Sequence, residues 1–122
     1  MGLKHSTGKS FYYAFSGLKE AFLKEPNLRI HFWFGAGAIF LGLILGLTKV
    51  EWIILSSVIF YVVSLELINT VIESLVNLVS PEIQKEAKYA KDISASVVLC
   101  AAILSVIVGL FLFLPKIITL FN

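Results

Sequence analysis

The sequence predicts an all-α membrane protein with one amphipathic surface helix followed by three transmembrane helices. Its composition is the first indication, because 58% of the 122 residues are hydrophobic and 15% are charged, with a mean hydropathy of +0.92. A soluble domain with one covered core is far less apolar. The second indication is that the apolar residues gather in three stretches long enough to cross a bilayer. This length allows a single domain, residues 1–122, without an accessory soluble unit.

The surface helix is expected over about residues 6–25. Aromatic and leucine side chains recur there at spacings of four, three and four, with polar residues in the other sectors, which is the pattern of a helix that lies in the membrane interface. Pro26 ends or bends this helix and holds Glu25 at its junction with the first span. The segment has neither the apolar core nor the cleavage site of a signal peptide. The recurring apolar residues are Phe11, Phe15, Leu18 and Phe22.

The three spans differ in character. The first contains glycines that offer small positions for close helix contact, and a short turn at residues 48–51 follows it. The second is longer than a bilayer requires, so we expect its C-terminal part to emerge into water. A charged segment, residues 82–92, separates it from the third span, which is closed by Pro115. The spans are expected over about residues 28–47, 52–79 and 93–114. The glycines are Gly35, Gly37, Gly42 and Gly46.

The basic residues indicate the orientation of the chain in the membrane. Eight of the ten lysines and arginines fall on one side of a three-span arrangement, whereas Lys49 and Lys116 fall on the other, and positive residues mark the cytoplasmic side. We therefore expect a cytoplasmic N-terminus and an outside C-terminus, which gives Glu25 and Glu73 access to cytoplasmic ATP. The net charge of +2 is too small to indicate a nucleic-acid partner. The eight residues are Lys4, Lys9, Lys19, Lys24, Arg29, Lys85, Lys88 and Lys91.

Three polar side chains in the second span form the candidate functional site. A carboxylate near the middle of a bilayer costs about 2.5–3.5 kcal/mol by insertion scales, so such residues mainly face protein or a polar cavity. At about 100° per residue, Glu66, Asn69 and Glu73 lie within roughly 60° of one another on one helical face. We expect this face to point inward. Because three helices shield a polar face poorly, we also expect a homo-oligomer that closes it.

This polar face is compatible with several chemistries. Two carboxylates and an amide suit cation coordination, a proton relay or general-base activation of a hydroxyl group, and polar side chains that only join helices are the structural alternative. A phosphate-binding P-loop is excluded, although Gly8, Lys9 and Ser10 resemble its end. The P-loop pattern requires glycine at position 3, where Leu3 stands, and an α/β domain for which the chain has no room.

Spaced motifs resemble a known family. The sequences E-L-I-N-T-V-I-E at residues 66–73 and A-K-Y-A-K-D at residues 87–92 resemble the signature E-x-x-N-x-x-x-E … A-K-x-A-K-D. That signature belongs to the small prokaryotic integral-membrane lipid kinases, the diacylglycerol kinase and undecaprenol kinase family. Upstream, E-P-N-L-R-I-H at residues 25–31 is similar to the version found in the undecaprenol kinase branch. The resemblance covers residues 10–115, in the same order and with the same three-span layout.

The resemblance implies an activity and an assembly. It implies a homotrimer in a prokaryotic plasma (inner) membrane that transfers the γ-phosphoryl group of ATP, with Mg²⁺, to a lipid alcohol at the cytoplasmic interface. Phosphoryl transfer mainly requires positioning and charge neutralisation, which few residues can supply. By the same resemblance, Glu66 would be the general base facing the lipid hydroxyl. Asn69, one turn away, would orient groups at the reaction centre.

The resemblance also implies which residues bind the nucleotide and the metal. Glu25 and Glu73 would hold Mg²⁺, which commonly takes one or two carboxylates together with substrate phosphates and water. Lys91 and Asp92 would contact the phosphates and the sugar region of the nucleotide. Tyr13, on the surface helix, would pack at the nucleotide.

Two positions depart from the family pattern. Some members have an arginine near the start of the surface helix, where this chain has Ser6 and, nearby, Lys9. Ala95 stands where relatives have a serine close to the site. We therefore assign no role to these three residues.

The acceptor and the class of protein have alternatives. Asn27, Arg29 and His31 favour undecaprenol or another polyprenol, with diacylglycerol as the alternative acceptor, since both present a primary hydroxyl at the interface. A different class is a non-catalytic oligomeric channel or transporter-accessory subunit, in which Glu66 and Glu73 line a polar path. A purely structural helix bundle is the third class. Consumption of ATP separates the kinase from the other two.

Overall fold

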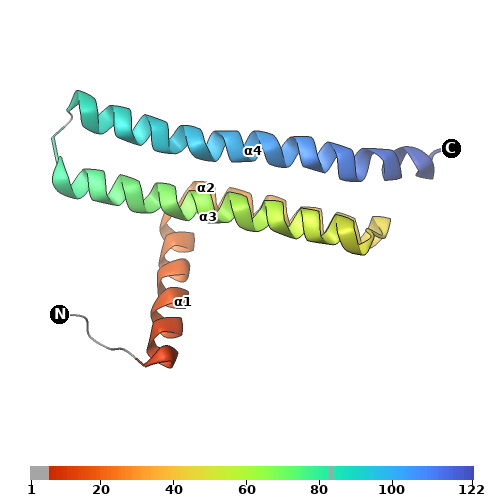
Figure 1. Cartoon of the computed structure of the whole chain (residues 1–122), viewed down its shortest axis with the longest axis horizontal. Coiled ribbons are helices and arrows are strands. Elements are labelled where there is room, and N and C mark those ends of the chain that lie inside the picture. The colour runs from red at the N-terminus through yellow and green to blue at the C-terminus, as the bar shows by residue number, and fades with distance from the viewer. Residues whose placement is uncertain (1–5, 83) are drawn as a thin grey trace.

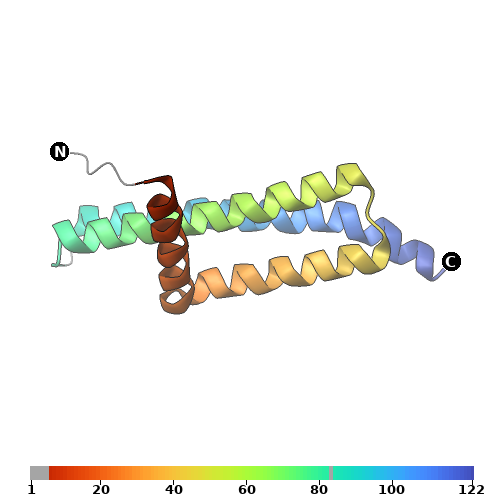
Figure 2. The same cartoon turned by 90° about the horizontal axis from the view of Figure 1, so that it is seen from below.

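The computed structural model describes residues 6–82 and 84–122 and is built of helices. Three of these helices are long and apolar enough to cross a membrane, and the first runs across them (Figures 1 and 2). This arrangement confirms the predicted class of a surface helix with three spans. Leu3 and Lys4 lie outside the described residues. The helices are α1 (Thr7–Lys24), α2 (Pro26–Leu45), α3 (Lys49–Val79) and α4 (Lys85–Leu120).

The corner between α1 and α2 is built by three consecutive sequence features. Glu25 has an extended backbone, and Pro26 is the first residue of α2, where its missing N–H leaves no hydrogen bond unmade. The guanidinium of Arg29 then donates to two carbonyl oxygens in the last turn of α1, at 3.1 and 2.8 Å, and so satisfies groups that the helix end leaves open. Glu25, the residue between the two helices, therefore lies at the junction of the surface helix with the bundle.

The contact between α2 and α3 depends on two of the four predicted glycines. Gly35 faces the side chain of Ile59, and Gly42 faces Leu47 and Trp52, so these positions allow close helix contact. Gly37 makes no such contact within the chain, because a Cβ there would meet nothing within 4 Å. Gly46 serves the turn instead, since it ends α2 with a φ of 69° that favours glycine.

The turn between α2 and α3 is shorter than predicted. Thr48 is the N-cap of α3, and its hydroxyl accepts a hydrogen bond from the Glu51 backbone N–H at 3.3 Å. The Glu51 carboxylate in turn accepts one from the Thr48 backbone N–H at 2.7 Å. This capping box starts the helix at Lys49, so residues 49–51 belong to the first turn of α3.

The two longest helices, α3 and α4, lie side by side and extend past the start of α2 (Figures 1 and 2). With 31 and 36 residues, they measure about 46 and 54 Å at about 1.5 Å per residue, against a hydrocarbon core of about 30 Å. The helix α4 does not end at Pro115, the residue predicted to close the third span, but continues through it to Leu120. Neighbouring helices make proline tolerable inside membrane helices, and the next residue, Lys116, forms an ion pair of 3.1 Å with Glu51 of α3.

Candidate functional site

Glu66 is the most deeply buried charged residue in the described part of the chain. It lies on α3 and is 2% exposed. The charges that act on its carboxylate come from three places: His31 on α2, Glu25 at the corner and Glu73 two turns further along α3. A buried carboxylate with two other carboxylates and an imidazole near it is costly unless a partner or a reaction uses it. The fold therefore builds an acidic site from segments that are distant in sequence.

Asn69 is held by a partner on α4. It is half-buried, and its side-chain oxygen accepts a hydrogen bond of 2.7 Å from the hydroxyl of Ser94. Ser94 is itself buried, 7% exposed, and was not among the residues predicted from the sequence. The buried residues of α4 include Ser94, Val98 and Ala101, whose spacing of four and three places them on one face of the helix. Neighbouring positions of α4 are also apolar or small, so the sequence does not single out this face.

Glu73 and Lys91 form the outer part of the site. The Lys91 Nζ lies 3.3 Å from the Glu73 Oε1 and donates to the Asn77 Oδ1 at 3.1 Å. The side chain of Glu73 is 47% exposed and that of Lys91 is 36% exposed. An ion pair with this exposure contributes at most about 1 kcal/mol to stability. Phosphate groups can therefore compete for the lysine, and a cation for the carboxylate, at small cost. Asn77 lies in the C-terminal part of α3, which the sequence predicts to emerge into water, but its hydrogen bond with Lys91 was not predicted.

The structure separates Asp92 from this group within one chain. Its side chain is 63% exposed and pairs with Lys88, one turn earlier on the same helix, at 3.3 Å. Lys91 and Asp92 are adjacent, so their side chains point about 100° apart around α4. Lys91 reaches the polar face of α3, whereas Asp92 lies on an outer face of the chain.

Tyr13 and Glu25 line one groove between α1 and α3. The groove has a volume of about 460 Å³, and Thr70 and Ser74 are among the residues that line it from α3. It is open to the outside and lies beside the turns of α3 that carry Glu66, Asn69 and Glu73. The structure thus brings the predicted tyrosine and corner carboxylate to the same side of the molecule.

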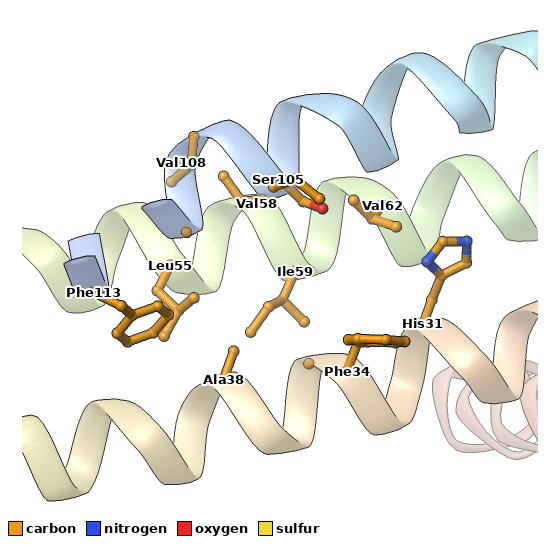
Figure 3. Close-up of a pocket in the computed structure, with 13 residues that line it drawn as sticks. His31, Phe34, Ala38, Leu55, Val58, Ile59, Val62, Ser105, Val108 and Phe113 are labelled. Atoms are coloured by element: carbon orange, nitrogen blue, oxygen red, sulfur yellow. The ribbon is translucent and has the colours of Figure 1, made fainter. Parts of the chain in front are cut away.

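An apolar cavity lies one turn of α3 away from Glu66. It has a volume of about 200 Å³ and is lined from α2, α3 and α4. His31 stands at one end of it and Phe113 at the other (Figure 3). Val62, one turn before Glu66, also lines it. Polar groups and apolar space therefore meet at the level of Glu66, which suits a ligand with a polar end and an apolar body.

The acidic residues do not form a closed metal cage. No group of three or more His, Cys, Asp or Glu side chains that could hold a metal ion is present among residues 6–82 and 84–122. Glu25 and Glu73 offer two carboxylates that both act on Glu66. Hard carboxylate oxygens in this number fit Mg²⁺ that keeps water and phosphate oxygens as its other ligands. They do not fit an ion held by the protein alone.

Fold and site together define a small integral membrane protein with an acidic site where the surface helix meets the bundle. The model of the prokaryotic diacylglycerol kinase family matches residues 12–113 of the chain. The chain belongs to the prokaryotic diacylglycerol kinase family, and it is a lipid kinase. This confirms the family indicated by the motifs.

Three relatives show how the similarity is distributed. The chain is 38% identical over 108 residues to the undecaprenol kinase of Bacillus subtilis, covering 88% of each protein. It is 41% identical over 112 residues to a diacylglycerol kinase of Synechocystis, covering 91% of this chain and 64% of the relative. It is 35% identical over 113 residues to the diacylglycerol kinase of Haemophilus influenzae, covering 92% and 95%. Relatives of both acceptor types thus match nearly the whole chain.

Proposed function

We propose that this protein transfers the γ-phosphoryl group of ATP, with Mg²⁺, to the hydroxyl of undecaprenol at the cytoplasmic membrane interface. The observation that carries the proposal is the position of Glu66. This buried carboxylate lies on α3, one turn after Val62 of the apolar cavity and two turns before Glu73 of the outer polar group. A lipid alcohol needs that combination, because its hydroxyl must meet a base and a phosphoryl donor while its tail stays in an apolar environment.

Glu66 acts as the general base in this proposal. Its carboxylate takes the proton from the lipid hydroxyl as the alcohol oxygen forms a bond to the γ-phosphorus, and the bond from that phosphorus to the ADP oxygen breaks. Burial keeps water away from the base, so a lipid hydroxyl competes well against hydrolysis. Asn69, one turn further along α3, orients the reacting groups.

The nucleotide is held by the outer group of residues. Glu25 and Glu73 would hold Mg²⁺, which neutralises charge on the phosphate oxygens when bound. Lys91, now paired with Glu73, would turn to the phosphates. Tyr13 would pack at the nucleotide from the groove that it shares with Glu25, and Asp92 would contact the sugar region.

The acceptor proposal depends on the α1–α2 corner and on one relative. The sequence E-P-N-L-R-I-H at residues 25–31 and the match to the Bacillus undecaprenol kinase over 88% of both chains support undecaprenol. Within this segment the Arg29 guanidinium is hydrogen-bonded to carbonyl oxygens of α1. His31, whose charge acts on Glu66, is therefore the side chain that would contact the acceptor. Diacylglycerol is the alternative acceptor, supported by the two other relatives.

The proposed assembly is a homotrimer with its N-terminus in the cytoplasm. The excess of lysine and arginine at the end of the bundle that carries α1 supports this orientation. A single chain leaves Glu73 and the α1–α3 groove open to the outside. Neighbouring copies would close the site around the nucleotide.

The test is phosphate transfer from γ-labelled ATP by purified protein in mixed micelles that contain Mg²⁺ and either undecaprenol or diacylglycerol. We expect labelled undecaprenyl phosphate, reduced at least about 100-fold in Glu66→Gln. Glu86→Gln, at an exposed position in the first turn of α4, is the matched control and should keep full activity. Label chiefly in phosphatidic acid would refute undecaprenol as the acceptor but would leave the role of Glu66 as general base unchanged. Equal activity of the two variants would overturn the role of Glu66.

A further inference from the structure

Ser94 is the buried polar residue to which the proposed reaction gives no role. Within the described residues, Glu66 and Ser94 are the polar or charged residues counted as buried. The Ser94 hydroxyl donates across the α3–α4 contact to Asn69 Oδ1, 2.7 Å away and 25 residues apart in sequence. The two side chains also line one groove between α3 and α4. The hydrogen bond therefore reaches a residue of the candidate site from a different helix.

The direction of this hydrogen bond is unusual for the chain. A hydroxyl inside a membrane helix has a carbonyl of its own helix within reach, and it commonly bonds there. Five other serine and threonine hydroxyls in the described helices do so, whereas Ser94 bonds to a side chain on another helix. The hydroxyls with a backbone partner in their own helix are those of Ser57, Thr70, Ser96, Ser105 and Thr119.

The bond determines which part of the Asn69 amide remains available. An asparagine side chain has one oxygen that accepts hydrogen bonds and one nitrogen that donates two. Because the oxygen of Asn69 is engaged by Ser94, the amide plane is fixed and the two N–H groups are left to other partners. These N–H groups belong to a half-buried residue on the face of α3 that also carries Glu66 and Glu73.

We propose that Ser94 is a positioning residue for phosphoryl transfer, holding Asn69 so that its amide N–H groups and not its oxygen meet the transferred phosphoryl group. This inference rests on the proposed function. Phosphoryl oxygens are anionic and need hydrogen-bond donors, whereas Mg²⁺ needs oxygen ligands. Asn69 therefore acts as a donor to the phosphoryl group and does not ligate the metal.

A purely structural role for Ser94 makes a different prediction. A hydrogen bond that only joins α3 to α4 would change the stability of the bundle and leave the turnover of folded protein unchanged. A positioning bond acts on kcat, because a misplaced amide weakens the transition state more than substrate binding. The comparison of kcat with stability therefore separates the two roles.

The kinetic test uses Ser94→Ala, Ser94→Thr and Ser96→Ala in the mixed-micelle assay. We expect kcat to fall about fivefold to tenfold in Ser94→Ala, the effect of one neutral hydrogen bond, with KM for ATP and lipid changed less than about twofold. Ser94→Thr keeps the hydroxyl and should recover most of the turnover. Ser96→Ala is the control, since its hydroxyl is exposed and bonds to the backbone of its own helix. Equal kcat for Ser94→Ala and Ser96→Ala would overturn the positioning role.

A second measurement does not depend on activity. In protein labelled with ¹⁵N-asparagine, the side-chain NH₂ signals of Asn69 are identified by their loss in Asn69→Ala. We expect Ser94→Ala to shift or broaden these signals and Ser96→Ala to leave them in place. Unchanged signals in Ser94→Ala would show that the hydroxyl does not hold the amide, and would overturn the inference even if kcat fell.

The donor role of Asn69 has its own test. Asn69→Asp keeps an oxygen for Ser94 and replaces the N–H groups by a charged oxygen, so we expect it to lose at least as much kcat as Asn69→Ala. Asn69→Asp with wild-type turnover and a lower Mg²⁺ requirement would overturn the donor role in favour of metal ligation. Failure of wild-type protein to label either lipid would instead refute the proposed function, and this inference with it.

Discussion

Replacing Gly42 by alanine should destabilise the bundle, although alanine is the better helix former. A Cβ on Gly42 would lie 2.8 Å from Leu47 Cδ1 and 3.0 Å from Trp52 Cη2. Leu47 belongs to the apolar core with Leu55 and is itself 8% exposed, so it has little room to move. Overpacking of this kind costs about 1–3 kcal/mol, and the higher helix propensity of alanine offsets about 0.5–1 kcal/mol of it. The expected net loss is about 0–2.5 kcal/mol.

Gly37→Ala is the matched control for this prediction. Gly37 lies on the same helix, but a Cβ there would meet nothing within 4 Å. The variant therefore gains the helix propensity of alanine without a steric clash. The difference between the variants therefore measures the steric cost alone, about 1–3 kcal/mol. Unfolding of micelle-bound protein by titration with dodecyl sulfate, followed by circular dichroism, gives both free energies. Equal stability of the two variants would refute the close approach of α2 to the start of α3.

Three further predictions concern charged pairs. Glu73→Gln should raise the Mg²⁺ concentration for half-maximal activity by about tenfold or more in the transfer assay. An unchanged Mg²⁺ concentration would show that Glu73 does not bind the metal. Lys116→Met breaks the half-buried pair with Glu51 and should cost about 1 kcal/mol in the same unfolding titration, with no loss of kcat. Lys24 donates a hydrogen bond to Glu20 at 2.6 Å, which holds the pKa of that carboxyl below its ordinary value.

The sign of the last effect follows from the direction of the shift. Because the pKa of Glu20 is lower in the folded chain, the pair stabilises α1 above the ordinary pKa of that carboxyl and loses this contribution as acid protonates it. A carbon-detected titration of the Glu20 carboxyl measures the pKa directly, and Lys24→Ala should raise it. A carboxyl that titrates equally in both proteins would contradict the hydrogen bond. Both side chains are well exposed, so added salt should weaken the effect.

The sequence predicts best those features that depend on one segment at a time. Proline geometry alone identifies the corner at Glu25 and Pro26, and the structure has the helix boundary there. The position of Glu66 follows from the cost of a carboxylate in lipid, and the structure buries it. Hydropathy likewise predicts the three spans, since the bilayer imposes one length requirement on each helix.

Features that depend on contacts with a neighbouring helix could not be predicted from the sequence. Nothing in the local pattern around Asn69 indicates that its oxygen is engaged by Ser94, because that contact depends on how α4 packs against α3. Pro115 predicts a helix end locally, yet α4 continues past it beside α3. Gly37 and Gly42 look alike in sequence, but Gly42 alone of the two contacts other side chains. These differences share one cause: the periodicity of a sequence does not show which residues of other helices a side chain will contact.

The position of Asp92 leads to a prediction about the assembly. In its own chain this carboxylate lies on an outer face and pairs with Lys88, whereas Lys91 beside it reaches Glu73. We therefore expect that, in the proposed homotrimer, Asp92 contacts a nucleotide bound at the Glu66 site of a neighbouring copy. Each site of the proposed homotrimer then needs Glu66 from one chain and Asp92 from the next.

Mixing two inactive variants tests this arrangement. Glu66→Gln and Asp92→Asn should each lose lipid phosphorylation, but unfolding them together and refolding them as a one-to-one mixture should restore about a quarter of wild-type activity. A site recovers when its Glu66 and its neighbouring Asp92 both come from unmutated positions, which random assembly of a cyclic oligomer achieves in about one case in four. The same variants mixed only after separate refolding are the control and should stay inactive. No recovery after joint refolding would place both residues of each site in a single chain, or would remove Asp92 from the site altogether.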